Sequence, residues 1–577
     1  MIKVSDYILK FLQKKNISTI FTVSGGGCIH LIDSLGKSNI KYVCCHHEQS
    51  ATMAAEGYTR LNNSPCCAIL TTGPGGINAL TGVMGAFTDS IPMFIISGQV
   101  SLSQTIGATG CRQVGEQEFP IIPTVKYMTK YSTMITDKIS IPWELENAYN
   151  IMMSGRRGPV WLDIPLDIQG AFIEDIDNNF TNTENLPQLN LNTLINALKL
   201  SKKPLIVAGN GIRLSGGVDK FREFLSKYNI PAITTCHSAV DTINDDYKYY
   251  CGRFGILGQR SSNKIIQESD LLICIGSRLP LKTTGYNVDK FAPNAKKFLI
   301  DIDIFEMNKH KFSIEDKIVV SADIFIETLD KNLNGLKLKI DDWKEWCLSK
   351  RNNDVFVQKK HYDLKNYASA YVFVEKLAQY IPESVPTITS NGAAHVVVQS
   401  TMKLKGNQRL FTNVGCASMG YGLPAAMGAC FANNKKSVVC IEGDGSIMMN
   451  LQELQTIKHH NLPIKIFIIN NDGYASIKQT QLAFFKGAEY ASGPNSGVTL
   501  PSFKKIADGF NIKYYNVKTN GELDVIKDVL EENCPVICEI FTYPNEPFEP
   551  KVIAKGIDSN GKIIPGELSD SYISETF

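Results

Sequence analysis

The chain has 577 residues, which is too long for one hydrophobic core and predicts three or more domains. Its 59 basic and 57 acidic side chains give a formal net charge of +2, so there is no basic excess to neutralise a nucleic-acid backbone. Hydrophobic residues at 44% and charged residues at 20% are typical of a globular protein, and no apolar run is long enough to span a bilayer. We therefore expect neither nucleic acid nor a membrane as a partner.

The first block of predicted α/β structure covers residues 1–172. It opens with an amphipathic helix over residues 1–16, whose apolar side chains recur at helical spacing, typical of a surface helix and not of a secretory signal. Short apolar strands, such as residues 67–70 and 93–97, then alternate with helical stretches. The polar, turn-rich residues 173–190 predict a linker to the next block.

Two further blocks follow. The second covers residues 191–336, and a charged helical linker over residues 337–363 leads to the third, residues 367–543. The tail, residues 544–577, is rich in proline, glycine and acidic residues. The alternation of strands and helices predicts an α/β fold of three doubly wound parallel sheets, with ligand-binding loops at the carboxyl ends of the strands.

The third block carries the most specific motif of the chain. A strand over residues 437–442 ends in Gly443, Asp444, Gly445 and Ser446; a helix over 449–460 and a strand over 462–469 then lead to Asn470 and Asn471. Glycines let backbone N–H groups approach an anion, and Asp444 offers a hard oxygen to a cation. A right-handed crossover returns Asn471 to the sheet edge that holds Asp444. The motif predicts a magnesium-bound diphosphate, and the alternative is a strand-helix-strand unit with polar turns.

The fifteen cysteines include the adjacent pairs Cys44-Cys45 and Cys66-Cys67 in or beside apolar runs. No Cys-x-x-Cys spacing is present to indicate zinc. Structural thiols in a reducing compartment explain this pattern best, so we expect a cytoplasmic protein.

The motif in the third block resembles that of thiamine diphosphate-dependent enzymes. Residues 46–60, 72–78 with 89–92, and 419–426 are similar to other segments of this family, and residues 158–165 resemble acetolactate synthase large subunits. The resemblance implies that the three blocks are a pyrimidine-binding domain, a central Rossmann-like domain and a diphosphate-binding domain. It also implies a homodimer or homotetramer, with the cofactor between the first block of one subunit and the third block of another.

The resemblance also assigns roles to individual residues. Glu48 would hydrogen-bond the aminopyrimidine ring and so help to activate the thiazolium carbon. Met419 would be the apolar wedge that bends the cofactor, the alternative being a core methionine, and Gln117 is the third catalytic candidate. Magnesium would be bound by Asp444, Asn471 and the carbonyl of Gly473. The other candidates for cofactor binding are Gly73, Asn78, Ala394, His395, Ala417, Gly443, Gly445, Ser446, Tyr474 and Ala475.

The implied reaction is decarboxylation of a 2-oxo acid, with pyruvate as the expected donor, and carboligation of the two-carbon unit to a carbonyl acceptor. Acetolactate synthases of branched-chain amino-acid synthesis have a tryptophan nine residues after the magnesium asparagine, where this chain has Thr480. Residues 473–481, 112–113 and 117–118 are instead similar to a subgroup linked to surface polysaccharides, whose acceptor is a nucleotide-linked keto-sugar. The acceptor is therefore open between this class and a second pyruvate. The substrate candidates are Gly26, Gln113, Gln117, Ile477, Lys478 and Gln481, and the polar ones are alternatively solvated surface residues.

Other interpretations of the chain stay open. A simple 2-oxo acid decarboxylase, or a thiamine diphosphate-dependent hydrolase or lyase acting on a cyclic diketone or a thioester, would carry the same motif. A cofactor-free binding protein is disfavoured, because Glu48, Asp444 and Asn471 occur together. Glycine turns at residues 209–211, 255–258 and 276–278 occupy places where acetolactate synthases often hold a non-redox flavin. Glycine turns after strands are also common in Rossmann-like domains in general, so the binding of FAD is left open.

Overall fold

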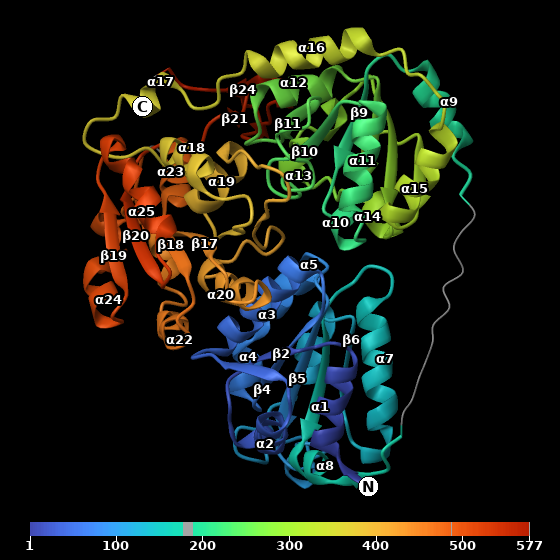
Figure 1. Ribbon diagram of the computed structural model, residues 1–577, viewed down its shortest axis with the longest axis vertical. Helices are drawn as coiled ribbons and strands as arrows, with labels where there is room; N and C mark the ends of the chain where they lie inside the picture. Colours follow the sequence, from blue (N-terminus) through green and yellow to red (C-terminus); the bar gives the residue numbers. More distant parts are fainter. Residues whose placement is uncertain (177–188, 486, 576–577) are drawn as a thin grey trace.

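The computed structural model describes residues 1–176, 189–485 and 487–575. These residues form three lobes, each built on a six-stranded sheet whose strands are all parallel (Figure 1). The predicted fold of three doubly wound parallel-sheet domains is thereby confirmed. Most of the predicted linker, residues 173–190, lies outside the described residues, and the exact domain boundaries stay predictions.

The N-terminal sheet has the strand order β3-β2-β4-β5-β7-β6. Its strands are β2 (Thr19–Thr22), β3 (Lys41–Cys44), β4 (Cys66–Leu70), β5 (Met93–Gln99), β6 (Tyr131–Met134) and β7 (Val160–Pro165). The helices are α1 (Val4–Lys14), α2 (Ile29–Lys37), α3 (Glu48–Asn62), α4 (Pro74–Asn78), α5 (Leu80–Thr88), α6 (Ile121–Val125), α7 (Ile141–Met153) and α8 (Leu166–Gly170). Strands β4 and β5 are buried along their whole length, as expected for a parallel sheet covered on both faces. A short pair, β1 (Ile2–Lys3) with β8 (Phe172–Ile173), closes the domain.

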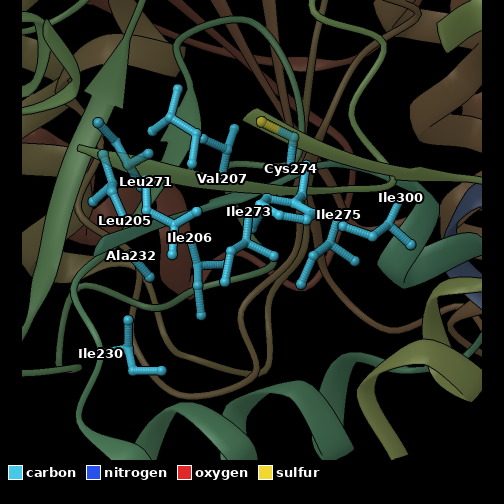
Figure 2. Packing of buried hydrophobic residues seen from close by; sticks show 14 of the residues in the cluster. Leu205, Ile206, Val207, Ile230, Ala232, Leu271, Ile273, Cys274, Ile275 and Ile300 are labelled. Carbon is cyan, nitrogen blue, oxygen red and sulfur yellow. The ribbon is translucent and has the colours of Figure 1, made fainter. Parts of the chain in front are cut away.

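The middle sheet has the order β11-β10-β9-β12-β13-β14. Its strands are β9 (Pro204–Ala208), β10 (Ala232–Thr235), β11 (Tyr250–Phe254), β12 (Leu271–Ile275), β13 (Lys296–Asp301) and β14 (Asp316–Val319). The helices are α9 (Asn192–Leu200), α10 (Gly211–Leu214), α11 (Val218–Tyr228), α12 (Arg260–Glu268), α13 (Leu281–Thr284), α14 (Ile304–Asn308) and α15 (Ala322–Leu333). Figure 2 shows the aliphatic side chains at its centre, among them Ile206, Ile273 and Ile300, which are buried in one cluster.

The C-terminal sheet has the order β16-β15-β17-β18-β20-β19. Its strands are β15 (Thr387–Thr389), β16 (Leu410–Phe411), β17 (Val438–Gly443), β18 (Ile464–Asn470), β19 (Lys513–Val517) and β20 (Val536–Phe541). The helices are α18 (Ala370–Tyr380), α19 (Ala393–Thr401), α20 (Gly422–Ala432), α21 (Asp444–Ile447), α22 (Glu453–His459), α23 (Ala475–Phe484), α24 (Phe503–Gly509) and α25 (Ile526–Glu531). The strand order departs from the chain order beside β15 and β17, and this point of an open α/β sheet is where ligands commonly bind.

The helix predicted over residues 449–460 is shorter in the structure. Helix α22 begins only at Glu453, and Asp444 to Ile447 form the short helix α21. The residues between the two helices form turns, where the buried Asn450 side chain is committed to hydrogen bonds with other segments of the chain. Such tertiary contacts override the local helical pattern.

Helices α3 and α20 join the N-terminal and C-terminal domains and lie side by side in Figure 1. Glycines allow this close approach: a Cβ atom on Gly57 would lie 2.3 Å from the Ala425 carbonyl oxygen, and one on Gly428 would lie 1.8 Å from the Ala54 carbonyl oxygen. A single hydrophobic cluster runs from the N-terminal sheet through both helices into the C-terminal sheet. The two terminal domains of one chain therefore share a core.

The segments outside the three sheets pack on both the middle and the C-terminal domains. Helix α16 (Asp341–Asn352) buries Trp343 and Cys347 in the core of the middle sheet, beyond the predicted domain end at residue 336. The short helix α17 (Lys359–Tyr362) follows it. The tail forms the strand pairs β21 (Lys551–Val552) with β24 (Ser571–Tyr572), and β22 (Gly556–Ile557) with β23 (Ile563–Ile564). It reaches the same core through Leu568.

Among the described residues, no helix combines the length and the apolar character that a bilayer crossing requires.

Candidate active site

Asp444 and Asn471 follow neighbouring parallel strands of the C-terminal sheet. Gly443, the last residue of β17, is paired with Ile469 of β18, so the residues after both strands meet at one edge of the sheet. The Oδ2 atom of Asp444 accepts hydrogen bonds from the backbone N–H groups of Asn471 (2.9 Å) and Gly473 (3.1 Å). The crossover between the two strands thus brings the two halves of the motif into direct contact.

The Asp444 carboxylate is almost fully buried, at 1% exposure. Burial raises the pKa of this carboxyl group from its ordinary 3.8 to about 6, and backbone N–H groups, chiefly those of Gly473 and Gly445, oppose this rise only in part. A divalent cation would stabilise the charged form that burial disfavours. A buried carboxylate of this kind favours the binding of a cation.

The two asparagines of the motif have different roles. Asn470 supports the loop: its Nδ2 donates to Glu539 Oε1 (2.6 Å), and its Oδ1 accepts from the Asp472 N–H (3.1 Å). The Oδ1 atom of Asn471 is buried and has no hydrogen-bond partner. Buried polar atoms in proteins almost always have a partner, so this amide oxygen fits a metal ligand.

Residues Asp444, Asn471 and Gly473 fit a magnesium site made of hard oxygens. In the described ranges no group of three or more His, Cys, Asp or Glu side chains could hold a metal ion, which excludes a carboxylate or histidine cage there. A single carboxylate joined by an amide oxygen, a carbonyl oxygen and phosphate oxygens is the usual way Mg²⁺ is held beside a phosphorylated ligand. Gly473 has φ +123°, and a Cβ atom there would lie 2.5 Å from the Ser492 carbonyl oxygen, so only glycine fits.

The residues predicted to approach the diphosphate surround the same edge. The ring of Tyr474 packs over Gly445, where a Cβ atom would lie 2.4 Å from it. The hydroxyl of Ser446 lies 2.7 Å from the hydroxyl of Ser390, which follows β15. Ala394 lies in the first turn of α19, and Ala475 is the first residue of α23. These helix starts bring backbone N–H groups to the edge, which suits an anion.

His395 is turned away from this edge toward the middle domain. Its ring stacks on that of His237, and His395 Nε2 lies 3.3 Å from His237 Nδ1. Burial lowers the pKa of His395 to about 3 and that of His237 to about 4, so both rings are neutral at pH 7. The side chain of His395 thus links two domains and brings no positive charge to a diphosphate.

Met419 and Ala417 lie on residues 412–420, which we call the wedge loop. Ala417 is exposed and has φ +50°, and its carbonyl accepts from the Asn391 amide. Met419 is half-buried, and the N–H of the next residue, Gly420, donates to Ser446 Oγ (2.9 Å). The wedge loop is therefore tied directly to the residues after β17.

Glu48 is the first residue of α3 and is 8% exposed. Its Oε2 accepts a hydrogen bond from Asn78 Nδ2 (3.0 Å) at the end of α4, and Gly75 leaves room beside its Oε1. His47 caps the helix by accepting from the Gln49 N–H (3.1 Å). The carboxylate is thus held in one orientation by its neighbours at the carboxyl edge of the N-terminal sheet.

The remaining N-terminal candidates lie in loops at the same edge. A Cβ atom on Gly73 would lie 2.0 Å from the Gln117 carbonyl oxygen, and Gln117 itself has φ +63° with an exposed side chain. Gln113 is less free, because its Nε2 donates to the Glu118 carbonyl oxygen (3.0 Å). Gly26 is exposed, and no neighbouring side chain or backbone atom lies within 4 Å of the position that a Cβ atom would take there. The structure therefore gathers Gly26, Gly73 and Gln117 near Glu48's edge of the sheet.

The substrate candidates of α23 divide into internal and exposed residues. Lys478 is buried at 9% exposure, and its Nζ donates to the Asp472 carbonyl oxygen (2.6 Å) in the loop after β18. Gln481 holds the following segment, donating to the Tyr490 carbonyl oxygen (2.7 Å) and accepting from Ser492 Oγ (2.7 Å). Ile477 and Thr480 are exposed. Two of the polar candidates thus support the chain itself.

The glycine turns of the middle domain are explained by contacts within the protein. A Cβ atom on Gly209 would lie 2.0 Å from the Gly276 carbonyl oxygen, and one on Gly211 would lie 2.7 Å from Gly276 Cα. On Gly255 it would lie 2.6 Å from Cys236 Sγ. Neighbouring atoms of the chain fill the space that these glycines leave, so the turns give no independent support for a flavin.

An open cavity of about 670 Å³ lies elsewhere, beside Arg409, Asn407 and the ends of α3 and α20. Its lining residues within 383–386 and 407–409 precede β15 and β16, at the end of the C-terminal sheet opposite the carboxyl edge. The cavity is therefore separate from the candidate active site at the strand ends.

Sequence reasoning misses several residues that organise the site. Asn450 joins Ser50 of α3 to the carbonyl of Gly420, and Asp89 binds the N–H of Gly415. Most of these contacts join segments hundreds of residues apart, so no local pattern marks them. For Asp89, the resemblance of residues 89–92 to a family segment is a signal, but it does not reveal the contact with Gly415.

Comparisons with known proteins agree with this geometry. Residues 2–119 match the N-terminal TPP binding domain of thiamine pyrophosphate enzymes, residues 191–329 match the central domain, and residues 390–540 match the C-terminal TPP binding domain. The acetolactate synthase isozyme 2 large subunit of Escherichia coli K12 is 32% identical, over 91% of this chain and 93% of its own length. The acetolactate synthase large subunit of Lactococcus lactis is 29% identical over 97% and 96%, and the chloroplastic acetolactate synthase 2 of Nicotiana tabacum is 29% identical over 99% and 86%. The chain belongs to the thiamine pyrophosphate enzymes of the acetolactate synthase large-subunit type.

Proposed function

We propose that this enzyme uses thiamine diphosphate and Mg²⁺ to decarboxylate a 2-oxo acid, with pyruvate as the donor, and to join the two-carbon unit to a carbonyl acceptor. The observation that carries the proposal is the buried Asp444 beside the unpartnered oxygen of Asn471, in a chain that also holds a buried Glu48. The relatives named above are acetolactate synthases, which supports this reaction class.

When bound, thiamine diphosphate would supply a nucleophilic thiazolium carbon and an electron sink for the decarboxylation of a 2-oxo acid. Asp444, Asn471 and the Gly473 carbonyl would hold Mg²⁺ against the diphosphate. Glu48 would share a proton with the aminopyrimidine ring, and its hydrogen bond from Asn78 keeps the carboxylate oriented for this task. Met419, which is half-buried, would pack against the cofactor, and Gln117, with an exposed side chain, would face the substrate.

We propose that the active unit is a homodimer or a larger homo-oligomer, with Glu48 of one subunit facing the metal site of the other. Exposed apolar side chains beside both half-sites support a protein partner there: Ile477, Leu482 and Phe484 on α23, and Ile77, Met84 and Phe87 on α4 and α5. Such patches on the surface of an enzyme usually mark an interface. The mass of an active sample in solution tests this, and an active monomer would exclude a shared site.

The acceptor is proposed to be either a second pyruvate or a larger, more polar carbonyl compound such as a nucleotide-linked keto-sugar. Thr480 is exposed and its hydroxyl is bonded to the Ser476 carbonyl oxygen (2.9 Å), so it offers less bulk than the tryptophan of acetohydroxyacid synthases. Ile477 and Gln117 remain free to contact an acceptor. The gap left by a small residue favours the larger acceptor class.

The test is a donor and acceptor screen read by mass spectrometry. With pyruvate, Mg²⁺ and thiamine diphosphate, we expect carbon dioxide together with acetolactate or a branched product. Acetaldehyde as the sole product would indicate a simple decarboxylase. A lack of turnover with every 2-oxo acid would instead point to a hydrolase or lyase of a cyclic diketone or a thioester.

The cysteine thiols bear on the cellular location of the protein. The fifteen cysteines are free thiols, which supports a reducing, cytoplasmic location.

A flavin in the middle domain is not part of the proposed mechanism, because other atoms of the chain already fill the space beside the glycine turns. The visible absorbance of the purified enzyme tests this, and a yellow protein with bound FAD would reverse it.

A further inference from the structure

Asp89 of the N-terminal domain contacts the wedge loop of the C-terminal domain in the same chain. It lies immediately after α5, and its Oδ1 accepts a hydrogen bond from the Gly415 N–H (2.9 Å). A Cβ atom on Gly415 would lie 2.5 Å from this oxygen, so glycine is needed for the contact. The carboxylate is therefore seated closely against the backbone of the loop.

A buried arginine fixes the orientation of this carboxylate. Arg60 donates through Nη2 to Asp89 Oδ2 (2.6 Å), and through Nη2 (2.6 Å) and Nε (3.0 Å) to Glu56 Oε1. The side chains of Arg60 and Asp89 are 7% and 10% exposed. Charge-assisted hydrogen bonds in a site screened so little by water are strong and directional. Arg60 thus points the other oxygen of Asp89 at Gly415.

The opposite end of the wedge loop is tied in a similar way. Asn450 Nδ2 donates to the Gly420 carbonyl oxygen (2.8 Å), and Asn450 Oδ1 accepts from Ser50 Oγ (2.9 Å) on α3. Between the two ties lies Ala417 at φ +50°. A residue with a Cβ atom in this conformation is strained by about 1–2 kcal/mol and persists only where its surroundings hold it. The N-terminal domain contributes to both restraints.

We propose that Asp89 is a positioning residue for the cofactor. By holding Gly415, it keeps Ala417 and Met419 in the conformation in which they would contact thiamine diphosphate. This inference rests on the role proposed above for Met419. Its consequence is that the first domain of each chain acts on two cofactor sites, on the partner subunit's site through Glu48 and on its own chain's site through the backbone of the wedge loop.

The test compares Asp89→Ala with Asp89→Asn, which keeps an acceptor oxygen for Gly415. The matched control is Asp241→Asn, because Asp241 ties Arg409 (2.6 Å) at another seam between domains and does not touch the wedge loop. The first measurement is amide hydrogen exchange of the peptide covering residues 412–420 in cofactor-free enzyme. Losing a hydrogen bond to a charged acceptor should speed this exchange about tenfold or more in Asp89→Ala. Asp89→Asn keeps an acceptor for Gly415 but turns its amide N–H₂ toward the Arg60 donor, so its exchange should lie between those of the wild type and Asp89→Ala.

The second measurement follows the bound cofactor. We expect the exchange of the thiazolium C2 proton, read by NMR, to slow about tenfold in Asp89→Ala, a change of about 1.4 kcal/mol in its barrier. The dissociation constant of Mg²⁺ and thiamine diphosphate should stay unchanged in calorimetry, because Asp444 and Asn471 are intact. The Asp241→Asn control should alter neither exchange rate.

The outcomes separate the two proposals. Unchanged amide exchange in Asp89→Ala, or a loss of cofactor affinity as large as the loss of C2 exchange, would overturn the positioning role. If the wild type binds no thiamine diphosphate, the proposed function fails, and so does the inference that rests on it, whatever the amide exchange shows. Should Asp89→Ala fail to fold, Arg60→Lys removes the fork that orients Asp89 and must show the same two changes in smaller measure; their absence would equally refute the proposal.

Discussion

The affinity for Mg²⁺ is expected to fall steeply with pH below 6, because a proton and the metal compete for Asp444. Burial raises the pKa of this carboxyl group to about 6 in the cofactor-free protein. Above pH 7 the group is charged, and the affinity should be constant. At pH 5 about nine tenths of the sites are protonated, so the affinity should be about tenfold weaker, or about 1.4 kcal/mol. An Asp with its ordinary pKa of 3.8 would change little over this range.

The assay is calorimetric titration of Mg²⁺ into protein with saturating thiamine diphosphate, at pH 7.5, 6 and 5 and in two buffers of different ionisation heat. The buffers report protons released on binding, which should approach about one at pH 5 and about 0.1 at pH 7. The diphosphate itself titrates near pH 6, so the same titration of free cofactor is subtracted. Affinity that is flat between pH 7 and 5 after this correction would refute the reasoning.

The same shift has a consequence for stability whose sign can be worked out. The folded-state pKa of Asp444, about 6, exceeds the ordinary 3.8, so the empty folded site binds a proton more tightly than the unfolded chain. The charged carboxylate then costs about 3 kcal/mol above pH 6, and this cost disappears as pH falls from 6 toward 4. Asp444→Asn removes the charge but also one hydrogen-bond acceptor worth about 1 kcal/mol. We expect the cofactor-free variant to unfold at a higher temperature than the wild type at pH 8, but not at pH 4.

Three other predictions concern activity, packing and the loop after β18. Glu48→Gln should lower turnover by about 10²–10⁴-fold with little change in cofactor affinity, and intact turnover would contradict the assigned activation role. Gly428→Ala should destabilise the protein by about 3 kcal/mol, because its Cβ atom would lie 1.8 Å from a carbonyl oxygen of α3. The control Gly36→Ala, on an open face of α2, should stabilise by up to about 1 kcal/mol, and equal thermal midpoints for the two variants would argue against the helix crossing. Lys478→Met should weaken Mg²⁺-dependent cofactor binding about tenfold by freeing the Asp472 carbonyl. A raised acceptor KM with unchanged cofactor affinity would instead place Lys478 at the substrate.

Some parts of the site could be predicted because they depend on local geometry. The strand that ends at Gly443, the crossover helix and the strand that ends at Asn470 must return to one sheet edge, so the partnership of Asp444 with Asn471 follows from spacing alone. The prediction of a helix over residues 449–460 is wrong in its start, because Asn450 is held by other segments. The residues at which a helix begins and ends depend on such tertiary contacts more than on the periodicity of apolar residues.

Polar residues on α23 illustrate what spacing cannot predict. Lys478 and Gln481 look like substrate ligands in the sequence, since they follow the metal motif on one helix. In the structure both hold neighbouring backbone, at Asp472 and at Tyr490. A polar side chain binds whichever partner the fold brings within reach, and that partner is decided by loops whose paths have no sequence period.

By itself, the sequence determined the three parallel sheets, the thiamine diphosphate family and the meeting of Asp444 with Asn471 at one sheet edge. These features repeat with the period of strands and helices or lie within one strand-helix-strand unit. Only the tertiary structure decided that helices α3 and α20 share one core, and that Asp89 meets Gly415 across 326 residues of chain. The reason is physical: local patterns encode backbone conformation and buried faces, whereas contacts between domains depend on how whole faces pack together.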